Sequence, residues 1–173
     1  IQAEMKQQGL GYLILQTPYN VMYATGYSPL VGSSAAIIPA EGDAHLIIST
    51  LESADAYAST NNVDVREFMS WVFIDNGTEE SRDVMDPDAV VHMTIDLIKN
   101  TPMDGKVGIE MGSVSHAFYG KLAASLPEGM IVDGSSVTRN CRVVKCQWEI
   151  DMLRLAATEA DKAWRAMAAE IKP

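Results

Sequence analysis

The chain has 173 residues, of which 47% are hydrophobic and 21% are charged. This length and composition allow one domain with a buried core and exclude a disordered chain. The formal net charge of −10 argues against a surface for nucleic acid or for an anionic membrane, because both require clustered Lys and Arg.

Strands and helices alternate through the first part of the chain. The patterns predict helices at residues 3–8, 19–24 and 51–61, and strands at 11–15 and 63–68. Between the second and third helices they predict a hairpin of two strands, at 34–38 and 44–49. Gly9 and Gly26 are expected to end the first two helices, because glycine readily adopts the left-handed conformation that follows a helix. Asn20 is the expected cap of the second helix, and Tyr23 is expected to pack inward.

The alternation continues after an acidic segment at residues 75–88. The patterns predict helices at residues 87–99 and 113–126, each followed by a strand, at 106–110 and 130–133. A connector at 135–146 and a long helix at 147–171 are expected to follow. Asp86 is expected to cap the first of these helices with Pro87 in its first turn, and Ser113 to cap the second. The residues of the first helix expected to face inward are Val90, Val91, Ile95 and Ile98.

This order of elements predicts an α/β fold. We expect a three-layer domain in which helices flank a mixed sheet of about six strands, because strands alternate with helices and the hairpin at 34–49 is antiparallel. The long helix that follows is expected to have about 24 residues and to be about 36 Å long.

One apolar stripe runs along the long helix, at Ile150, Leu153, Ala157, Ala160, Trp164, Met167 and Ile171. The spacings alternate between three and four, which places these residues on one helix face. Such a stripe is expected to be covered by other protein. The sequence is therefore expected to be part of a larger protein, divided near a domain border.

The residues that could carry chemistry form no recognisable catalytic motif. Ser113 and Ser115 lie near His116 but not in a nucleophile elbow, and the acidic segment lacks the ligand spacing of a calcium loop. Cys141 and Cys146 are too few for a disulfide framework, and with scattered histidines they give no zinc pattern. We expect no catalytic residue and no metal ligand set in this chain, and a reducing, cytoplasmic location without a membrane span.

Two segments of the chain resemble a known family. The first is Gly9–Leu15 followed by Asn20–Tyr27, and the second is Arg142–Lys145 followed by Glu149, Leu153 and Ala157, with Lys106–Glu110 between them. Their order and separation are similar to those of the N-terminal domain and domain junction of the creatinase/prolidase family. This family includes Xaa-Pro dipeptidases and aminopeptidase P.

The resemblance implies a domain organisation and a function. Residues 1–146 would form the N-terminal domain, with a ribonuclease H-like motif, and residues 147–173 a linker helix to a catalytic domain absent from this chain. That domain would bind two divalent metal ions (Mn, Co or Zn), whereas this chain alone would have no activity or cofactor. The family implies that this domain contacts its own catalytic domain and a second subunit in a homodimer, and that it restricts substrate size.

The resemblance also points to a loop that approaches the active site of the partner subunit. By position, this loop spans residues 27–34, with Tyr27, Pro29 and Leu30 as candidate contacts. Creatinases have an Arg there for the substrate carboxylate, and its absence here favours a dipeptidase or another amidohydrolase of the family over creatine hydrolysis. Trp71, with Phe73, is a further candidate for a substrate lid or dimer contact; covering the core or the sheet edge is the alternative.

The junction residues are expected to have structural roles. Arg142 and Lys145 precede the long helix, and Glu149 in its first turn suits the positive end of the helix dipole. The family usually has Ser where Cys146 stands, and a thiol caps helices poorly, so the first residue of the helix is left open. A second hypothesis also stays open: a stand-alone protein-interaction domain from a family member that lacks the metal ligands.

Overall fold

The computed structural model describes residues 1–30, 34–70 and 86–171 of the chain. The chain divides into two units, Ile1–Arg139 and Asn140–Pro173. The elements, in chain order, are α1 (Gln2–Gln7), β1 (Leu10–Leu15), α2 (Pro18–Thr25), β2 (Ala35–Pro39), β3 (Ala44–Ser49), α3 (Ser53–Ser59), β4 (Val63–Phe68), α4 (Ala89–Asn100), β5 (Lys106–Ile109), α5 (His116–Ser125), β6 (Ile131–Asp133), α6 (Ser135–Val143) and α7 (Gln147–Glu170).

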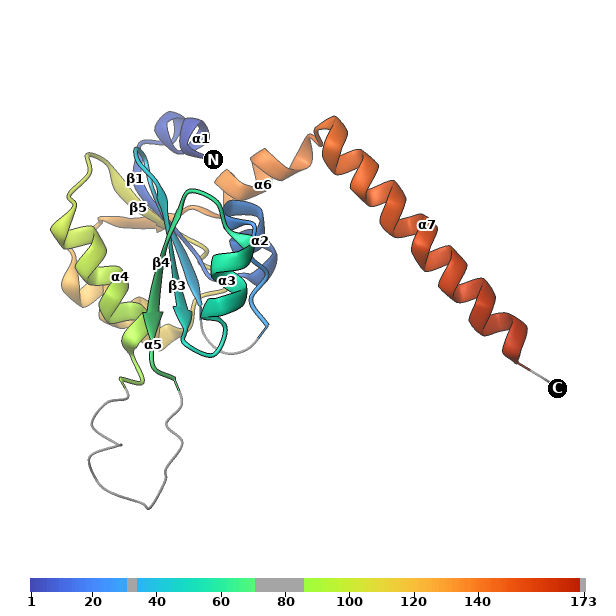
Figure 1. The fold of residues 1–173 in the computed structure, drawn as a ribbon. Coiled ribbons are helices and arrows are strands. Elements are labelled where there is room, and N and C mark those ends of the chain that lie inside the picture. The colour runs from blue at the N-terminus through green and yellow to red at the C-terminus, as the bar shows by residue number, and fades with distance from the viewer. Residues whose placement is uncertain (31–33, 71–85, 172–173) are drawn as a thin grey trace, which may run out of the picture. The chain divides into compact units, whose positions relative to one another are not determined.

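The first unit is built on a six-stranded mixed sheet with the order β4-β3-β2-β1-β5-β6 (Figure 1). Strand β2 pairs antiparallel with both β1 and β3, whereas β1 with β5, β5 with β6, and β3 with β4 are parallel pairs. The register places Leu13 opposite Ile38 in the β1–β2 pair and opposite Gly108 in the β1–β5 pair. All six residues of β1 are buried, as expected for a strand with helices on both faces.

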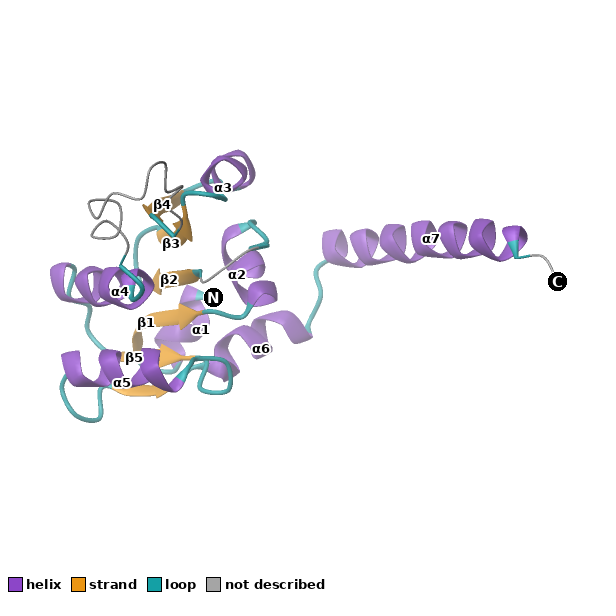
Figure 2. Ribbon diagram, turned by 90° about the horizontal axis from the view of Figure 1, so that it is seen from below, coloured by secondary structure: helices purple, strands orange, loops and turns teal. Residues whose placement is uncertain are grey.

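Helices cover both faces of this sheet (Figure 2). On one face, α4 and α5 pack against alternate strand residues such as Ile14, Ile37 and Ile109. On the other face, residues from α1, α2, α3 and α6 pack against the neighbours in sequence, such as Leu13 and Ile38. The period-two alternation of β-strand side chains therefore divides the core into two layers. The predicted three-layer α/β fold with a mixed sheet of about six strands is confirmed.

Several local expectations are confirmed. Gly9 and Gly26 have left-handed φ values of 68° and 84° just after α1 and α2. Residues Val90, Val91, Ile95 and Ile98 of α4 are buried, as their spacing predicts. Helix α7 has the expected 24 residues and contains the predicted apolar stripe as far as Met167, whereas Ile171 is the C-cap residue that follows the helix. Within the described ranges, no helix combines the length and the apolar character needed to cross a bilayer.

Other expectations were wrong, mostly at helix starts. The N-cap of α5 is Ser115, whose Oγ accepts a hydrogen bond from the Phe118 N–H at 3.1 Å, and not Ser113. Helix α4 begins at Ala89 after Asp88, because the Asp86 carboxylate accepts from the Asp88 N–H and so forms a turn before the helix. Thr17 is the N-cap residue of α2, so Asn20 lies inside that helix.

The remaining corrections concern Tyr23 and α6. Tyr23 does not pack inward, because 37% of it is exposed. Residues 135–143 are a helix and not a connector: Asp133 accepts hydrogen bonds from the Ser135 N–H and Oγ, which starts the helix, and Val137 and Thr138 are buried. Asp and Ser are typical residues of helix starts.

Candidate loop site at the carboxyl edge of the sheet

The carboxyl ends of the parallel strands β1 and β5 meet at one edge of the sheet. After β1 the chain continues through α2 to β2, on one side, and after β5 it continues through α5 to β6, on the other. In open α/β sheets, such a divergence of connections is a common place for a functional site. The loops at this edge are therefore the candidate functional site.

Glu110, directly after β5, fixes the start of α2. Its buried carboxylate accepts hydrogen bonds from the Gln16 N–H at 2.7 Å and the Thr17 N–H at 2.9 Å, and from the Asn20 side-chain amide. Thr17 Oγ1 also donates to Ser113 Oγ at 3.0 Å. An anionic group suits this position, because the first N–H groups of a helix have no partner within the helix. The contacts join segments that are 93 residues apart at Thr17 and Glu110.

The loop that follows α2 is fixed by a second buried carboxylate. The Glu52 Oε1 accepts hydrogen bonds from the Tyr27 hydroxyl at 2.9 Å and from the Leu30 N–H at 2.6 Å. Burial, with the Glu52 carboxylate next to the phenol, raises the pKa of Tyr27 to about 12. Tyr27 therefore stays protonated, and can donate, throughout the physiological pH range. The base of the loop is buried while the Leu30 side chain is exposed.

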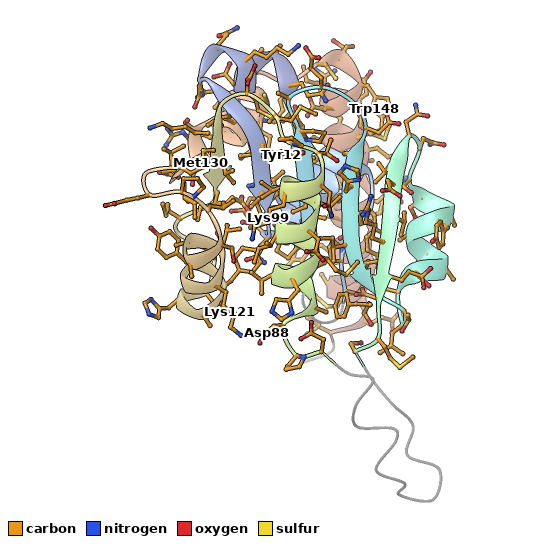
Figure 3. All side chains as sticks on the ribbon, turned by 90° about the vertical axis from the view of Figure 1, so that its left-hand side faces the viewer. Tyr12, Asp88, Lys99, Lys121, Met130 and Trp148 are labelled. Carbon is orange, nitrogen blue, oxygen red and sulfur yellow. The ribbon has the colours of Figure 1, made fainter. Side chains whose placement is uncertain are left out.

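A pocket of about 420 Å³ lies beside this loop. Its walls come from Pro29 and Leu30 of the loop, from Gln16 before α2, and from the first turns of α4 and α5. On the α4–α5 face, Lys121 of α5 forms an ion pair with Asp88 (Figure 3). The His92 ring bonds to Asp86 at 2.6 Å, which lowers the pKa of that carboxyl.

These contacts favour a positioning role over a catalytic one. The hydroxyls of Ser113 and Ser115 are used in the contact with Thr17 and in the cap of α5. Within residues 1–30, 34–70 and 86–171, no three His, Cys, Asp or Glu side chains form a group that could hold a metal ion.

The structure brings three of the four candidate loop residues together. Tyr27 is buried, Pro29 is partly buried, and Ser28 and Leu30 are exposed, so the described part of the loop offers Ser28 and Leu30 to another molecule. Trp71, Phe73 and most of the acidic segment lie outside the described residues. The proposed contacts of this loop with substrate or a second subunit stay predictions.

The junction residues lie in the second unit and make local contacts. The Lys145 ammonium donates to the Arg142 carbonyl, and the Cys146 N–H donates to Glu149 Oε2 at 2.8 Å. The second bond is one half of a capping box, and it lowers the pKa of Glu149. It also settles the open helix start: α7 begins at Gln147 with Cys146 as its N-cap.

Sequence reasoning missed the two carboxylates that organise the site, Glu52 and Glu110. A signal for Glu110 was present, because an acidic residue directly after a buried parallel strand lies at the carboxyl edge of the sheet. Glu52 gave no such signal, since it is simply the residue before helix α3. Its partners, Tyr27 and Leu30, are 25 and 22 residues away.

Comparison with known proteins identifies this architecture. The family model described as creatinase/prolidase N-terminal domain matches residues 1–144. No curated protein matches the chain in sequence. A prolidase from Pyrococcus horikoshii OT3 has a TM-score of 0.68 at 23% identity, with 99% of this chain and 42% of that chain covered.

Two further structures support the same fold. A prolidase from Pyrococcus furiosus has a TM-score of 0.70 at 22% identity, with 99% of this chain and 45% of that chain covered. The N-terminal domain of the cytoplasmic peptidase PepQ from Mycobacterium tuberculosis H37Rv has a TM-score of 0.60 at 21% identity, with 82% of this chain and 94% of that chain covered. The chain thus spans less than half of the two prolidases, and nearly all of a structure that is an N-terminal domain by itself.

Proposed function

The chain belongs to the creatinase/prolidase N-terminal domain family, and we propose that it is the non-catalytic N-terminal part of a metal-dependent Xaa-Pro dipeptidase-type hydrolase. In this proposal the domain takes part in dimerisation and limits the size of the substrate. The observation that carries it is the match over residues 1–144 combined with coverage of only 42% of a prolidase, which leaves room for a catalytic domain elsewhere in the protein.

The loop Tyr27–Leu30 supports the part of the proposal that concerns substrate size. A barrier to long substrates needs a fixed base and an exposed tip. Glu52 supplies the fixed base through the hydrogen bonds that its carboxylate accepts from Tyr27 and Leu30, and Leu30, which is 78% exposed, supplies the tip. An apolar tip of this kind limits substrate length by filling space, and it needs no charge to do so.

Exposed apolar side chains on α7 support the part that concerns other protein surfaces. Trp148, Leu155 and Trp164 are all exposed, and the first two lie on a different side of the helix from Trp164. Large exposed apolar areas mark contact surfaces in soluble proteins. The proposal assigns them to the catalytic domain and to a second subunit.

The metal ions and the cellular location are also proposals. Two divalent ions, Mn, Co or Zn, would be bound by the catalytic domain and not by the residues described here. A cytoplasmic location agrees with the two cysteines, which carry thiols.

The first experiment compares this chain with the longer protein. With Mn²⁺, Co²⁺ or Zn²⁺ and a Gly-Pro dipeptide, residues 1–173 should give no turnover, whereas the longer protein should hydrolyse the dipeptide in a metal-dependent way. Turnover by the chain alone would contradict the proposal. An inactive longer protein that lacks one of its metal-ligand positions would favour the alternative, an interaction domain.

A second experiment tests the size limit in the longer protein. Leu30→Ala should raise kcat/KM for an Xaa-Pro tripeptide by about tenfold relative to the dipeptide, because a bulky side chain is removed from the tip. Tyr57→Ala removes a side chain of similar exposure, 57%, from α3 and serves as the control. Equal kcat/KM ratios in Leu30→Ala and the unaltered protein would exclude a barrier at Leu30.

A further inference from the structure

We propose that Glu52 is a positioning residue that holds the loop Tyr27–Leu30 in the shape in which its tip limits the substrate. The inference rests on the function proposed for that loop and assigns the residue on which the loop's geometry depends. The Glu52 carboxylate contacts the loop at the Tyr27 hydroxyl and the Leu30 N–H, so it acts through the loop.

Glu52 connects the loop to the sheet. Its own N–H donates to the Ser49 carbonyl at 3.0 Å, at the end of β3. Its carboxylate accepts from the Tyr27 hydroxyl at the base of the loop and from the Leu30 N–H at the tip. One residue thus fixes both ends of a four-residue segment relative to strand β3.

The burial of Glu52 strengthens these hydrogen bonds. Only 6% of the residue is exposed, so water does not compete strongly for its Oε1. Hydrogen bonds to a carboxylate are roughly twice as strong as those between neutral groups. Leu30 itself is exposed, so its N–H would exchange rapidly with solvent if Glu52 did not hold it.

The chain contains a matched pair without this burial. The Tyr57 hydroxyl donates to Glu67 Oε1 at 3.0 Å, and both of these residues are exposed. The two pairs have the same chemistry and nearly the same distance, but only the buried one also binds a loop N–H. Glu67→Gln is therefore a control for the loss of a charge in a Tyr–Glu pair.

The first measurement is amide hydrogen exchange by NMR on residues 1–173. In the unaltered chain the Leu30 amide should exchange at least about tenfold more slowly than in an unstructured peptide. Glu52→Gln should remove about a factor of ten of this protection, because a neutral acceptor replaces a charged one. Glu67→Gln should leave Leu30 unchanged. An unprotected Leu30 in the unaltered chain overturns the proposal even if the Glu52 variant does not fold.

The second measurement is made on the longer protein and separates the anchor from the function of the loop. Glu52→Gln should shift the ratio of kcat/KM for tripeptide over dipeptide in the same direction as Leu30→Ala, with kcat for the dipeptide retained. Tyr27→Phe, which removes one donor to Glu52 and leaves the Leu30 N–H, should give a smaller shift in the same direction. A general loss of stability would instead lower both activities together.

The two measurements fail in different ways. Faster exchange at Leu30 with an unchanged substrate ratio would confirm the anchor and contradict the size limit proposed for the loop. Unchanged exchange in Glu52→Gln would contradict the anchor, whatever the substrate ratio.

Discussion

The sheet unit and helix α7 use acidic residues in opposite ways. In the sheet unit, Glu110 and Glu52 are buried, and each accepts hydrogen bonds from backbone N–H groups distant in sequence. In α7, Glu159 and Asp161 are exposed and pair with Lys162 and Arg165, three and four residues away. A carboxylate therefore holds distant segments together in the sheet unit, whereas in α7 it forms only exposed ion pairs within one helix.

The contribution of a charged side chain to the stability of the fold therefore depends on whether it is buried or exposed. An exposed ion pair contributes little because water screens it and two long side chains must be ordered. A buried carboxylate is costly to place, but the groups bound to it are left unsatisfied if it is removed. Removal should therefore be severe in the sheet unit and mild in α7.

The largest expected effect comes from Glu110→Ala. This change leaves the N–H groups of Gln16 and Thr17 and the Asn20 amide without the acceptor that joins them, so we expect a loss of about 3–5 kcal/mol in the free energy of unfolding. Urea unfolding of residues 1–173 measures it, with Glu159→Ala as the control. Similar losses in the two variants would remove the contrast between the regions.

An intermediate effect is expected at the start of α5. Ser115→Ala removes the hydroxyl that accepts from the Phe118 N–H and should cost about 1 kcal/mol in the same urea experiment. Ser113→Ala should cost less, since Ser113 contacts Thr17 and caps no helix. The reverse order would restore Ser113 as the cap that the sequence predicted.

A small effect is expected in α7. Asp161→Asn breaks the pair with Arg165, whose two side chains are 57% and 78% exposed, and should change local helix stability by about 0.3–0.5 kcal/mol. Hydrogen exchange of the α7 amides measures this change, which should shrink further in 1 M salt. A change above about 1 kcal/mol would mean that the exposed pair is worth as much as a buried contact.

Acid titration probes one carboxyl cap in each region. Bonds from Ser135 lower the pKa of Asp133, and the bond from the Cys146 N–H lowers the pKa of Glu149, from ordinary values of 3.8 and 4.5. Because the folded pKa is the lower one, each cap is fully stabilising above the ordinary value and is lost as the pH falls through the folded value. Carboxyl carbon shifts in NMR should show both midpoints below 3.8 and 4.5. Midpoints at or above these values would contradict the capping contacts.

Much of the fold could be predicted because its signals are local. Alternation marked the strands, a three-to-four spacing marked α4 and α7, and glycines marked the ends of α1 and α2. The errors arose where several residues could make the same local contact. Ser113 and Ser115 are both suitable caps, and only packing decides which one begins α5.

Only part of the candidate site could be predicted from the sequence. The loop at residues 27–34 was predicted through a family resemblance, but the residues that hold its described part, Tyr27–Leu30, were not. Tyr27 was taken as a surface contact, whereas its hydroxyl is buried against Glu52. Nothing in the spacing of Tyr27, Leu30 and Glu52 reveals that they meet, because strands β2 and β3 lie between them in the chain.

By itself, the sequence determined the order of the elements apart from helix α6, the layered α/β class, the length of α7 and the family, because periodicity, caps and motifs act over a few residues. Only the tertiary structure decided that Glu110 holds the start of α2 and that Glu52 holds the loop after it. Both contacts depend on the strand order, which places the ends of β1, β3 and β5 near segments far away in the chain. Long-range hydrogen bonds of buried carboxylates produce no periodic pattern in the sequence. Here such bonds hold the loop in its shape.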